Sequence, residues 1–164
     1  MTTKMRPAQP EDVPTIVSLI RALAIYEKLE SECHADAAAL EEHLFGARPA
    51  AEVVLAERDG EVAGFALFFH NYSTFLTKPG IYLEDLFVKP EHRGAGVGRS
   101  LLVHLAELAL ERGCGRLEWA VLDWNAPAIG FYERLGARPL NDWTVFRLTG
   151  DALRHLGSGT LPGR

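Results

Sequence analysis

A glycine-rich segment, residues 93–98 with the sequence RGAGVG, restricts the possible folds of this chain more than any other feature. An apolar run at 81–88 predicts a strand before it, and leucines at helical spacing predict a helix after it. Glycines allow successive backbone N–H groups to converge, and the start of a helix adds unpaired N–H groups and the positive end of its dipole. The segment therefore predicts a loop that binds a phosphate or pyrophosphate.

Two well-known phosphate-binding motifs do not fit this loop. A P-loop requires Lys followed by Ser or Thr after its last glycine, whereas Gly98 is followed by Arg99 and Ser100. A dinucleotide-binding fingerprint has the spacing G-x-G-x-x-G and opens a parallel βαβ unit, whereas this chain has G-x-G-x-G after strands that are predicted to form hairpins. From the residues alone, a phosphate loop of another kind and a glycine-rich turn without a ligand both remain open.

The rest of the chain predicts a mixed α/β fold with hairpins first and helical crossovers later. Asp59-Gly60 between two apolar runs is a strong hairpin signal. The expected strands are 5–8, 52–57, 62–70, 81–88, 116–122 and 143–148, with a polar loop at 71–80. The expected helices are 10–29, 35–45, 125–135 and one that runs from the glycine-rich loop to Gly113. We expect one domain over 1–155 and a flexible tail over 156–164.

Composition argues against several classes of function. The chain has 164 residues, of which 48% are apolar, enough for a core. A net charge of −5 without a long basic cluster argues against a nucleic acid partner and favours a small cationic substrate. There is no apolar run of about 20 residues to span a membrane and no apolar core of a signal peptide, so we expect a cytoplasmic protein. Cys33 and Cys114 show no pairing pattern and the six histidines no metal-ligand spacing, so we expect neither a disulfide nor a metal site.

Four stretches resemble a known family. Arg93, Gly96 and Gly98 match the R/Q-x-x-G-x-G/A acetyl-CoA loop of the GNAT superfamily of acetyltransferases. The other stretches resemble one branch of it, the spermidine/spermine (diamine) and thialysine acetyltransferases. They are LA-x-YE at 23–27, YLEDLFV at 82–88 and WN-x-P-x-x-x-FY-x-x-x-GA at 124–137. The resemblance extends from about Arg6 to Leu148.

The resemblance implies a GNAT fold, with a mixed, mostly antiparallel, seven-stranded sheet whose central strands splay around acetyl-CoA, and a homodimer. The residues that it assigns to acetyl-CoA follow the central strand, the glycine-rich loop and a later helix: Leu86, Phe87, Val88, Arg93, Gly94, Ala95, Gly96, Val97, Gly98, Arg99, Asn125, Ala126, Pro127, Ala128 and Tyr132. The residues that it assigns to the amine substrate are Tyr26, Glu27, Glu84, Asp85, Glu118 and Trp119.

The implied reaction is direct attack of an amine on the thioester through a tetrahedral intermediate. An alkyl amine has a pKa of about 10.4 and must first lose a proton. Glu84 either takes this proton through a water or serves only as a counter-charge to the ammonium. Strand alternation predicts that Glu84 and Asp85 point to opposite faces. Backbone N–H groups near Phe87 or Val88 can stabilise the oxyanion. Tyr132 matches the family's general acid, and an aromatic residue in a short helix is also typical of packing.

One stretch departs from the branch. After Gly136 the chain reads ARPLNDWTVF, whereas the animal polyamine enzymes carry a longer and more acidic connection. Asn141 and Asp142 leave one carboxylate there, so a polyamine and a thialysine- or lysine-like amino acid both remain open as substrates. Acetylation of a peptide or protein amine and non-catalytic sensing of acyl-CoA are further alternatives. Asn125 also fits the N-cap of a helix.

Overall fold

A computed structural model of the chain describes residues 2–160. The chain divides into two compact units, Met1–Leu122 and Asp123–Arg164, and each is described by itself. The expectation of a single domain over 1–155 stays a prediction.

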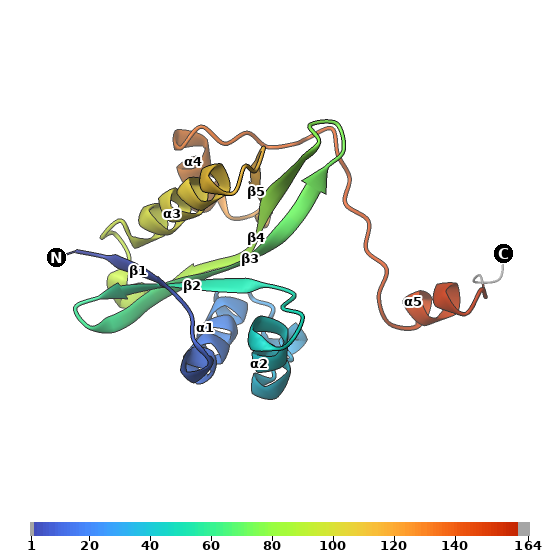
Figure 1. Cartoon of the computed structure of the whole chain (residues 1–164), viewed down its shortest axis with the longest axis horizontal. Helices are drawn as coiled ribbons and strands as arrows, with labels where there is room; N and C mark the ends of the chain where they lie inside the picture. The colour runs from blue at the N-terminus through green and yellow to red at the C-terminus, as the bar shows by residue number, and fades with distance from the viewer. Residues whose placement is uncertain (1, 161–164) are drawn as a thin grey trace. The chain divides into compact units, whose positions relative to one another are not determined.

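A five-stranded sheet forms the centre of the first unit (Figure 1). Its strands, in spatial order, are β1 (Lys4–Pro7), β2 (Glu52–Arg58), β3 (Glu61–Ser73), β4 (Lys78–Val88) and β5 (Leu117–Trp119). The pairs β1–β2, β2–β3 and β3–β4 are antiparallel, and β5 runs parallel to β4. The mixed sheet with flanking helices confirms the expected fold class. The expected number of seven strands was wrong, because the described residues form five.

The two hairpins show where polarity misleads a sequence-based prediction. Asp59 and Gly60 have φ angles of 54° and 82°, so both adopt the left-handed conformation that a tight hairpin turn needs. This turn was predicted correctly. The second hairpin is longer than expected, because β3 and β4 remain paired as far as Ser73 and Lys78. Backbone pairing in an antiparallel ladder does not require apolar side chains on both faces, so the predicted loop at 71–80 shrinks to 74–77.

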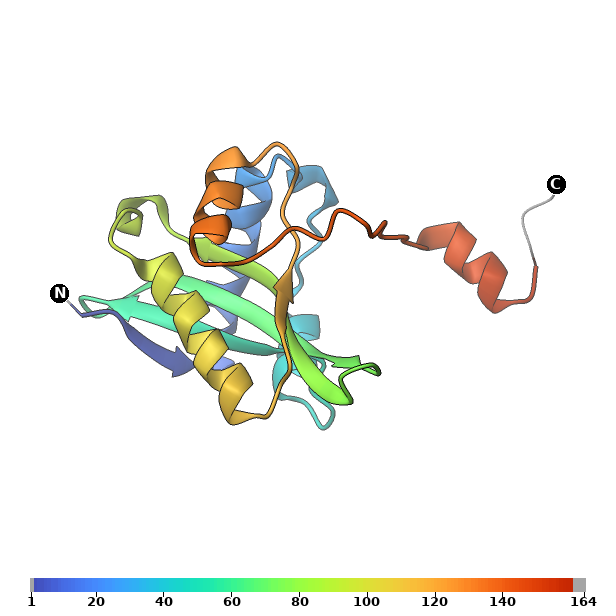
Figure 2. The ribbon, with the colours of Figure 1, turned by 90° about the horizontal axis from the view of Figure 1, so that it is seen from above.

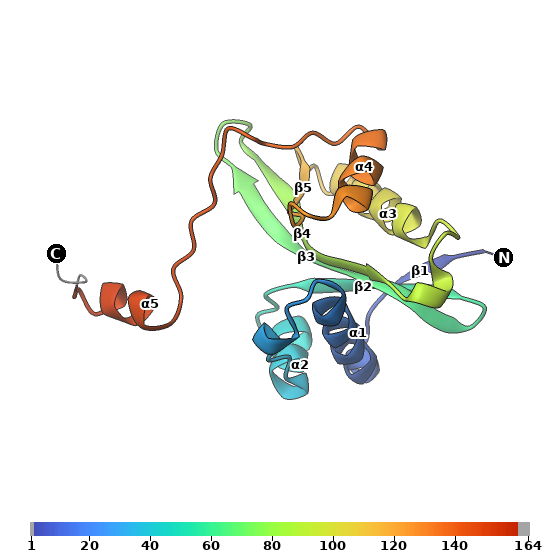
Figure 3. The ribbon, with the colours of Figure 1, turned by 180° about the vertical axis from the view of Figure 1, so that it is seen from behind.

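Helices cover both faces of this sheet (Figures 1 and 3). On one face lie α1 (Val13–Tyr26), which follows the short 3-10 helix η1 (Pro10–Asp12), and α2 (Ala37–Phe45), with η2 (Glu30–Glu32) between them. The core on this side is one cluster of apolar side chains: Ile16, Leu19, Leu23, Leu44, Val53, Leu55, Phe65 and Phe87.

The opposite face carries α3 (Val97–Glu111), which crosses the strands diagonally in Figure 2. Its buried residues recur at helical spacing, as the leucine pattern predicted: Val97, Leu101, Leu102, Leu105 and Ala109. The α3 helix follows η3 (Pro90–His92), so the segment between β4 and α3 is the glycine-rich loop.

The second unit contains α4 (Ala126–Arg134) and α5 (Gly150–Gly157). A last strand at 143–148 was wrong, because these residues have no regular structure and α5, which was not expected, follows them. Apolar residues alone do not make a strand, since its backbone groups must also find a paired neighbour. Residues 161–164 of the expected tail lie outside the described residues. Within residues 2–160, no helix is long and apolar enough to cross a membrane.

Candidate active site

The glycine-rich loop owes its shape to two glycines. Gly94 and Gly96 have φ angles of 77° and 80°, which other residues rarely adopt. Gly96 is also the N-cap of α3. Gly98 is not among the residues with positive φ, and a Cβ there would meet only the side chains of Val88 and Leu86, at 3.7 and 3.8 Å. The geometry therefore requires glycine at 94 and 96 but not at 98, which agrees with the alanine that the motif allows at its last position.

The loop fits a pyrophosphate. Residues 94–96 and Arg99 are exposed, and the first turn of α3 contains no acidic residue to repel an anion. Because Gly96 caps the helix without a side chain, no hydroxyl or carboxylate competes with a ligand for the first N–H groups. Val97 differs from its neighbours because its side chain is buried against the sheet. Contacts from Val97 to a ligand would therefore come from its backbone.

After Leu83, one edge of β4 has no strand partner in the first unit. The β4–β5 ladder covers only Ile81 to Leu83, so the strands separate before the stretch 86–88 that was assigned to acetyl-CoA. The N–H of Lys89 donates to the carbonyl of Ala63 on the β3 side at 2.9 Å. Successive residues of a strand direct their backbone groups to opposite sides, so the N–H and C=O of Val88 face away from β3. Of the two expected oxyanion donors, Val88 therefore has the suitable orientation.

Arg93 lies between this edge and the end of α1. Its Nε donates a hydrogen bond of 2.9 Å to the carbonyl oxygen of Val88. Its guanidinium carbon is 5.0 Å from the ring centroid of Tyr26 and 5.3 Å from that of Phe87. The Phe87 side chain belongs to the buried core, so this residue can reach a ligand only through its backbone.

A β-bulge in β4 sets the direction of the two expected acidic residues. Phe68 of β3 pairs with Leu83, whereas the preceding residue, Leu67, pairs with Asp85. Glu84 is therefore the extra residue of the bulge. Asp85 consequently lies on the face of Leu67, which packs against the cluster under α1. Glu84 is exposed and Asp85 is half-buried. Alternation from Leu83 alone would place Asp85 on the other face, so the bulge sets the face of Asp85. The expectation that Glu84 and Asp85 point to opposite faces stays a prediction.

The electrostatics of Asp85 are unusual. Burial, together with the negative charges of Glu84 and Glu27, raises its pKa from 3.8 to about 6. Burial also raises the pKa of Glu27. The negative charges of Glu84 and Glu27 therefore act on the carboxyl group of Asp85, and an ammonium group bound beside it would offset this repulsion.

Glu118 and Trp119 lie on β5, beside the part of β4 that precedes the bulge. The parallel register places Glu118 beside Tyr82 and Trp119 beside Leu83. Glu118 forms an ion pair with Arg116 at 2.6 Å and accepts a hydrogen bond from Asn71 Nδ2 at 3.3 Å. Its charge is therefore partly compensated within the protein.

Tyr82 is a further candidate residue that the sequence did not single out. Its ring stacks on that of Phe69 with centroids 5.3 Å apart, and burial together with Glu84 and Glu118 raises the pKa of its hydroxyl. The signal was its place in the stretch YLEDLFV, but its proximity to Glu118 depends on a parallel register that the sequence does not reveal.

The remaining expected residues belong to the second unit. Asn125 is the buried N-cap of α4, and its side-chain oxygen accepts a hydrogen bond of 3.4 Å from the N–H of Ala128, which confirms that reading. Ala126 and Pro127 open the helix. Tyr132 is half-buried and its ring centroid is 5.6 Å from that of Phe131.

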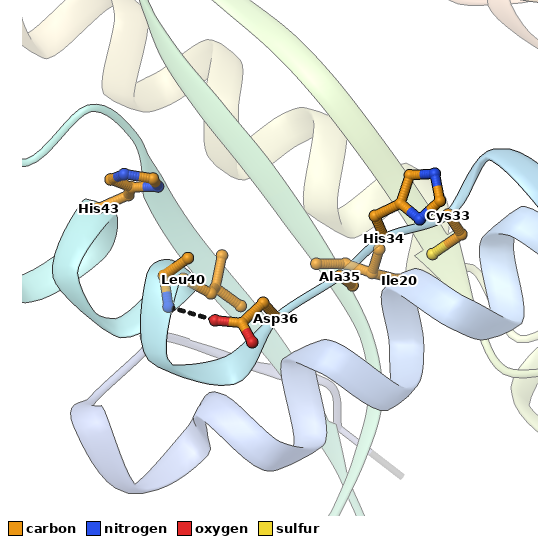
Figure 4. Close-up of a pocket in the computed structure, with 8 residues that line it drawn as sticks. Ile20, Cys33, His34, Ala35, Asp36, Leu40 and His43 are labelled. Carbon is orange, nitrogen blue, oxygen red and sulfur yellow. Dashed lines mark hydrogen bonds between the residues drawn. The ribbon is translucent and has the colours of Figure 1, made fainter.

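A separate hollow of about 340 Å³ lies between α1 and α2 (Figure 4). Most of its lining surface is apolar, and a smaller part is polar. The lining residues are Ile20, Cys33, His34, Ala35, Asp36, Ala39, Leu40 and His43. Asp36 is occupied as the N-cap of α2, where it accepts the N–H of Ala39 at 2.8 Å. None of the expected site residues lines this hollow. No group of three metal-binding side chains occurs within residues 2–160.

Comparison with known proteins gives concordant results. The sequence model described as "Acetyltransferase (GNAT) family" matches residues 19–137. Thialysine N-epsilon-acetyltransferase of Bos taurus is 41% identical over 93% of this chain and 95% of its own length. L-ornithine N5-acetyltransferase NATA1 of Arabidopsis thaliana is 36% identical over 94% and 87%, respectively. The solved structure of an integron cassette protein from Vibrio cholerae superimposes with a TM-score of 0.80 at 26% identity, covering 96% of this chain and 98% of that one.

Proposed function

Because the chain belongs to the acetyltransferase (GNAT) family, we propose that it transfers the acetyl group of acetyl-CoA to a primary amine of a small cationic molecule. The observation that carries this proposal is the carboxyl cluster of Glu27, Glu84 and Asp85, in which the pKa of Asp85 rises to about 6. A cluster of this kind lowers its own free energy by binding a cation. Thialysine, ornithine, lysine and polyamines are the candidate substrates, because the named relatives act on the first two and the sequence resembles enzymes of the others.

The residues divide the chemical tasks between them. Acetyl-CoA supplies the activated acetyl group, and the loop 94–99 would hold its pyrophosphate through backbone N–H groups and Arg99. Glu27, Glu84 and Asp85 would hold the ammonium form of the substrate. Val88 would donate its backbone N–H to the oxygen of the acetyl group, which gains negative charge during transfer.

Two carboxylates are candidates for the base that removes the proton from the amine. We propose Glu84, through a water, from the family resemblance. Asp85 is the second candidate, because a pKa of about 6 lies closer to neutral pH than that of an ordinary carboxylate and therefore suits proton transfer at that pH.

Tyr132 is the proposed general acid for the departing CoA thiolate. We expect Tyr132→Phe to lower kcat by roughly 10² while the Kd for CoA stays within about twofold, because only the hydroxyl is removed. Stopped-flow thiol release and isothermal titration with CoA measure the two quantities. An unchanged kcat would remove Tyr132 from the chemistry.

The experiment that tests the function is thiol release from acetyl-CoA with a panel of amines. The panel contains thialysine, lysine, ornithine, putrescine, spermidine, spermine, an aminoglycoside and a lysine peptide. Turnover confined to the small amines supports the proposal, and preference for the peptide would favour a peptide acetyltransferase. Tight CoA binding without turnover of any amine would favour an acyl-CoA sensor and overturn the enzymatic proposal for this panel.

We also propose a homodimer, as the family resemblance implies. Exposed apolar side chains at Trp143, Val145 and Phe146 support the dimer, since several such side chains close together in the sequence are typical of an interface.

A further inference from the structure

Arg93 makes contacts that its place in the glycine-rich loop does not require. A residue that only bound phosphate would direct its guanidinium toward the exposed side of the loop. Instead, its Nε donates to the carbonyl of Val88 at 2.9 Å and its guanidinium carbon lies 5.0 Å from the centroid of the Tyr26 ring. The side chain thus connects the loop with the last residue of α1.

Both contacts depend on the shape of the guanidinium group. A planar guanidinium can lie over an aromatic ring while an N–H in its plane donates to a carbonyl, whereas the point charge of lysine cannot do both. Arg99 serves as a comparison, because it lies on the same segment, is also exposed, and is not among the side chains found over the rings of Tyr26 and Phe87.

Each contact ends on a group with a proposed role in the reaction. The carbonyl of Val88 belongs to the residue whose N–H faces the unpaired edge of β4. Tyr26 directly precedes Glu27, whose charge helps to raise the pKa of Asp85. The chain after Tyr26 is held in one conformation, because Lys28 adopts a φ of 61° and the N–H of Leu29 donates to the carbonyl of Ala24 at 2.8 Å. A displacement of the Tyr26 backbone at the end of α1 would therefore move Glu27 with it.

We infer that Arg93 is a positioning residue that couples binding of CoA at the loop to binding of the amine beside Glu27. The inference rests on the proposed function, because it assumes that the loop holds CoA and that the carboxyl cluster holds the amine. By linkage, CoA tightens amine binding and the amine tightens CoA binding by the same factor. Arg93 transmits this effect through its contacts with Val88 and Tyr26.

The first test measures the coupling without turnover. Hydrogen exchange is followed for the whole chain, with and without saturating CoA. In the wild type we expect CoA to slow exchange both at 93–100 and at 24–29, by about threefold or more. In Arg93→Gln the protection at 93–100 remains and that at 24–29 is lost, because glutamine retains an amide donor for Val88 but carries no charge over Tyr26. In Arg93→Lys the protection at 24–29 is reduced, and exchange in the core of α3 reports whether each variant is folded.

The second test uses kinetics with the best amine of the panel. With the other substrate saturating, Arg93→Gln should raise the KM for the amine and the KM for acetyl-CoA by a similar factor of about fivefold or more, while the Kd for CoA alone stays within about twofold. Arg99→Gln should instead raise the Kd for CoA alone and leave the coupling between CoA and the amine unchanged, because its side chain is assigned only to the phosphate. Tyr26→Leu combined with Arg93→Gln should be no worse than either single variant, since both remove the same contact.

The outcomes separate the two proposals. Absence of CoA protection at 93–100 in the wild type would overturn the proposed function. Protection at 93–100 without any at 24–29, or protection at 24–29 that survives in Arg93→Gln, would overturn the coupling through Arg93 and leave the proposed function intact. Strictly additive effects of Tyr26→Leu and Arg93→Gln in the double variant would also contradict the coupling through Arg93.

Discussion

At the scale of single residues, the raised pKa of Asp85 connects the substrate site with stability. The native protein holds a proton on this carboxyl up to about pH 6, whereas the unfolded chain releases it near pH 4. Between these values the native state binds more protons than the unfolded state, so the free energy of unfolding falls as the pH rises. Above pH 6 the carboxyl is ionised in both states, and the full cost of burying its charge lowers the free energy of unfolding.

We therefore expect Asp85→Asn to be more stable than the wild type at pH 7.5, by on the order of 2 kcal/mol, and equally stable near pH 4. Urea denaturation across this pH range measures the difference. Glu30→Gln, a change at an exposed carboxylate, is the matched control and should alter stability by about 0.5 kcal/mol or less at any pH. Equal stability of Asp85→Asn and the wild type at pH 7.5 would contradict the pKa shift.

The same variant distinguishes the two candidate bases. If Asp85 is the base, kcat/KM of the wild type rises through about pH 6 and this limb disappears in Asp85→Asn. If Glu84 is the base, Glu84→Gln lowers kcat, while Asp85→Asn mainly raises the KM for the amine.

The glycines of the loop give a second prediction at this scale. An alanine Cβ at Gly96 meets no atom within 4 Å, so the cost of Gly96→Ala comes only from its φ of 80°. That cost is about 1–2 kcal/mol of unfolding free energy. Gly98→Ala should lie within about 0.5 kcal/mol of the wild type or be slightly more stable, because its Cβ makes ordinary contacts and alanine favours a helix. Chemical denaturation of the two variants side by side tests this, and equal losses would show that φ is not the deciding factor.

At the scale of elements, local signals were read correctly and long-range ones were not. The Asp59-Gly60 turn, the leucine face of α3 and the N-cap at Asn125 each depend on a few neighbouring residues, and the sequence predicted all three. The bulge at Glu84 depends on how β3 and β4 pair, so alternation along the sequence could not reveal which face Asp85 shares with Leu67.

The candidate site follows the same rule. The glycine-rich loop was recognisable because its chemistry is contiguous in sequence. The contact between Arg93 and Tyr26 and the pairing of Tyr82 with Glu118 join residues from distant parts of the chain, and no local pattern signals them. Family resemblance brought Tyr26 and Glu118 into the analysis, but it did not reveal these contacts.

At the scale of the whole molecule, the main question is what covers the apolar side chains of residues 143–148, the segment expected to form the last strand. Trp143, Val145 and Phe146 are 77%, 88% and 92% exposed. Contact of such large apolar side chains with water is unfavourable in free energy unless another surface covers them. In a symmetric dimer, each of these side chains would be buried in both subunits.

We expect the wild type to be a dimer by light scattering at micromolar concentration and Phe146→Lys to weaken its association by about 10² or more. The reason is that burial of one large apolar side chain contributes about 1.5–3 kcal/mol and the residue occurs twice in the assembly. Leu110→Lys is the matched control, because Leu110 is also an exposed apolar residue but lies on α3 of the first unit, and it should leave the association unchanged. A wild type that remains monomeric, or a dimer that Leu110→Lys disrupts and Phe146→Lys does not, would contradict an interface at 143–148. Since hydrogen exchange reports burial directly, the amides of this segment should also exchange more slowly at dimeric than at monomeric concentrations.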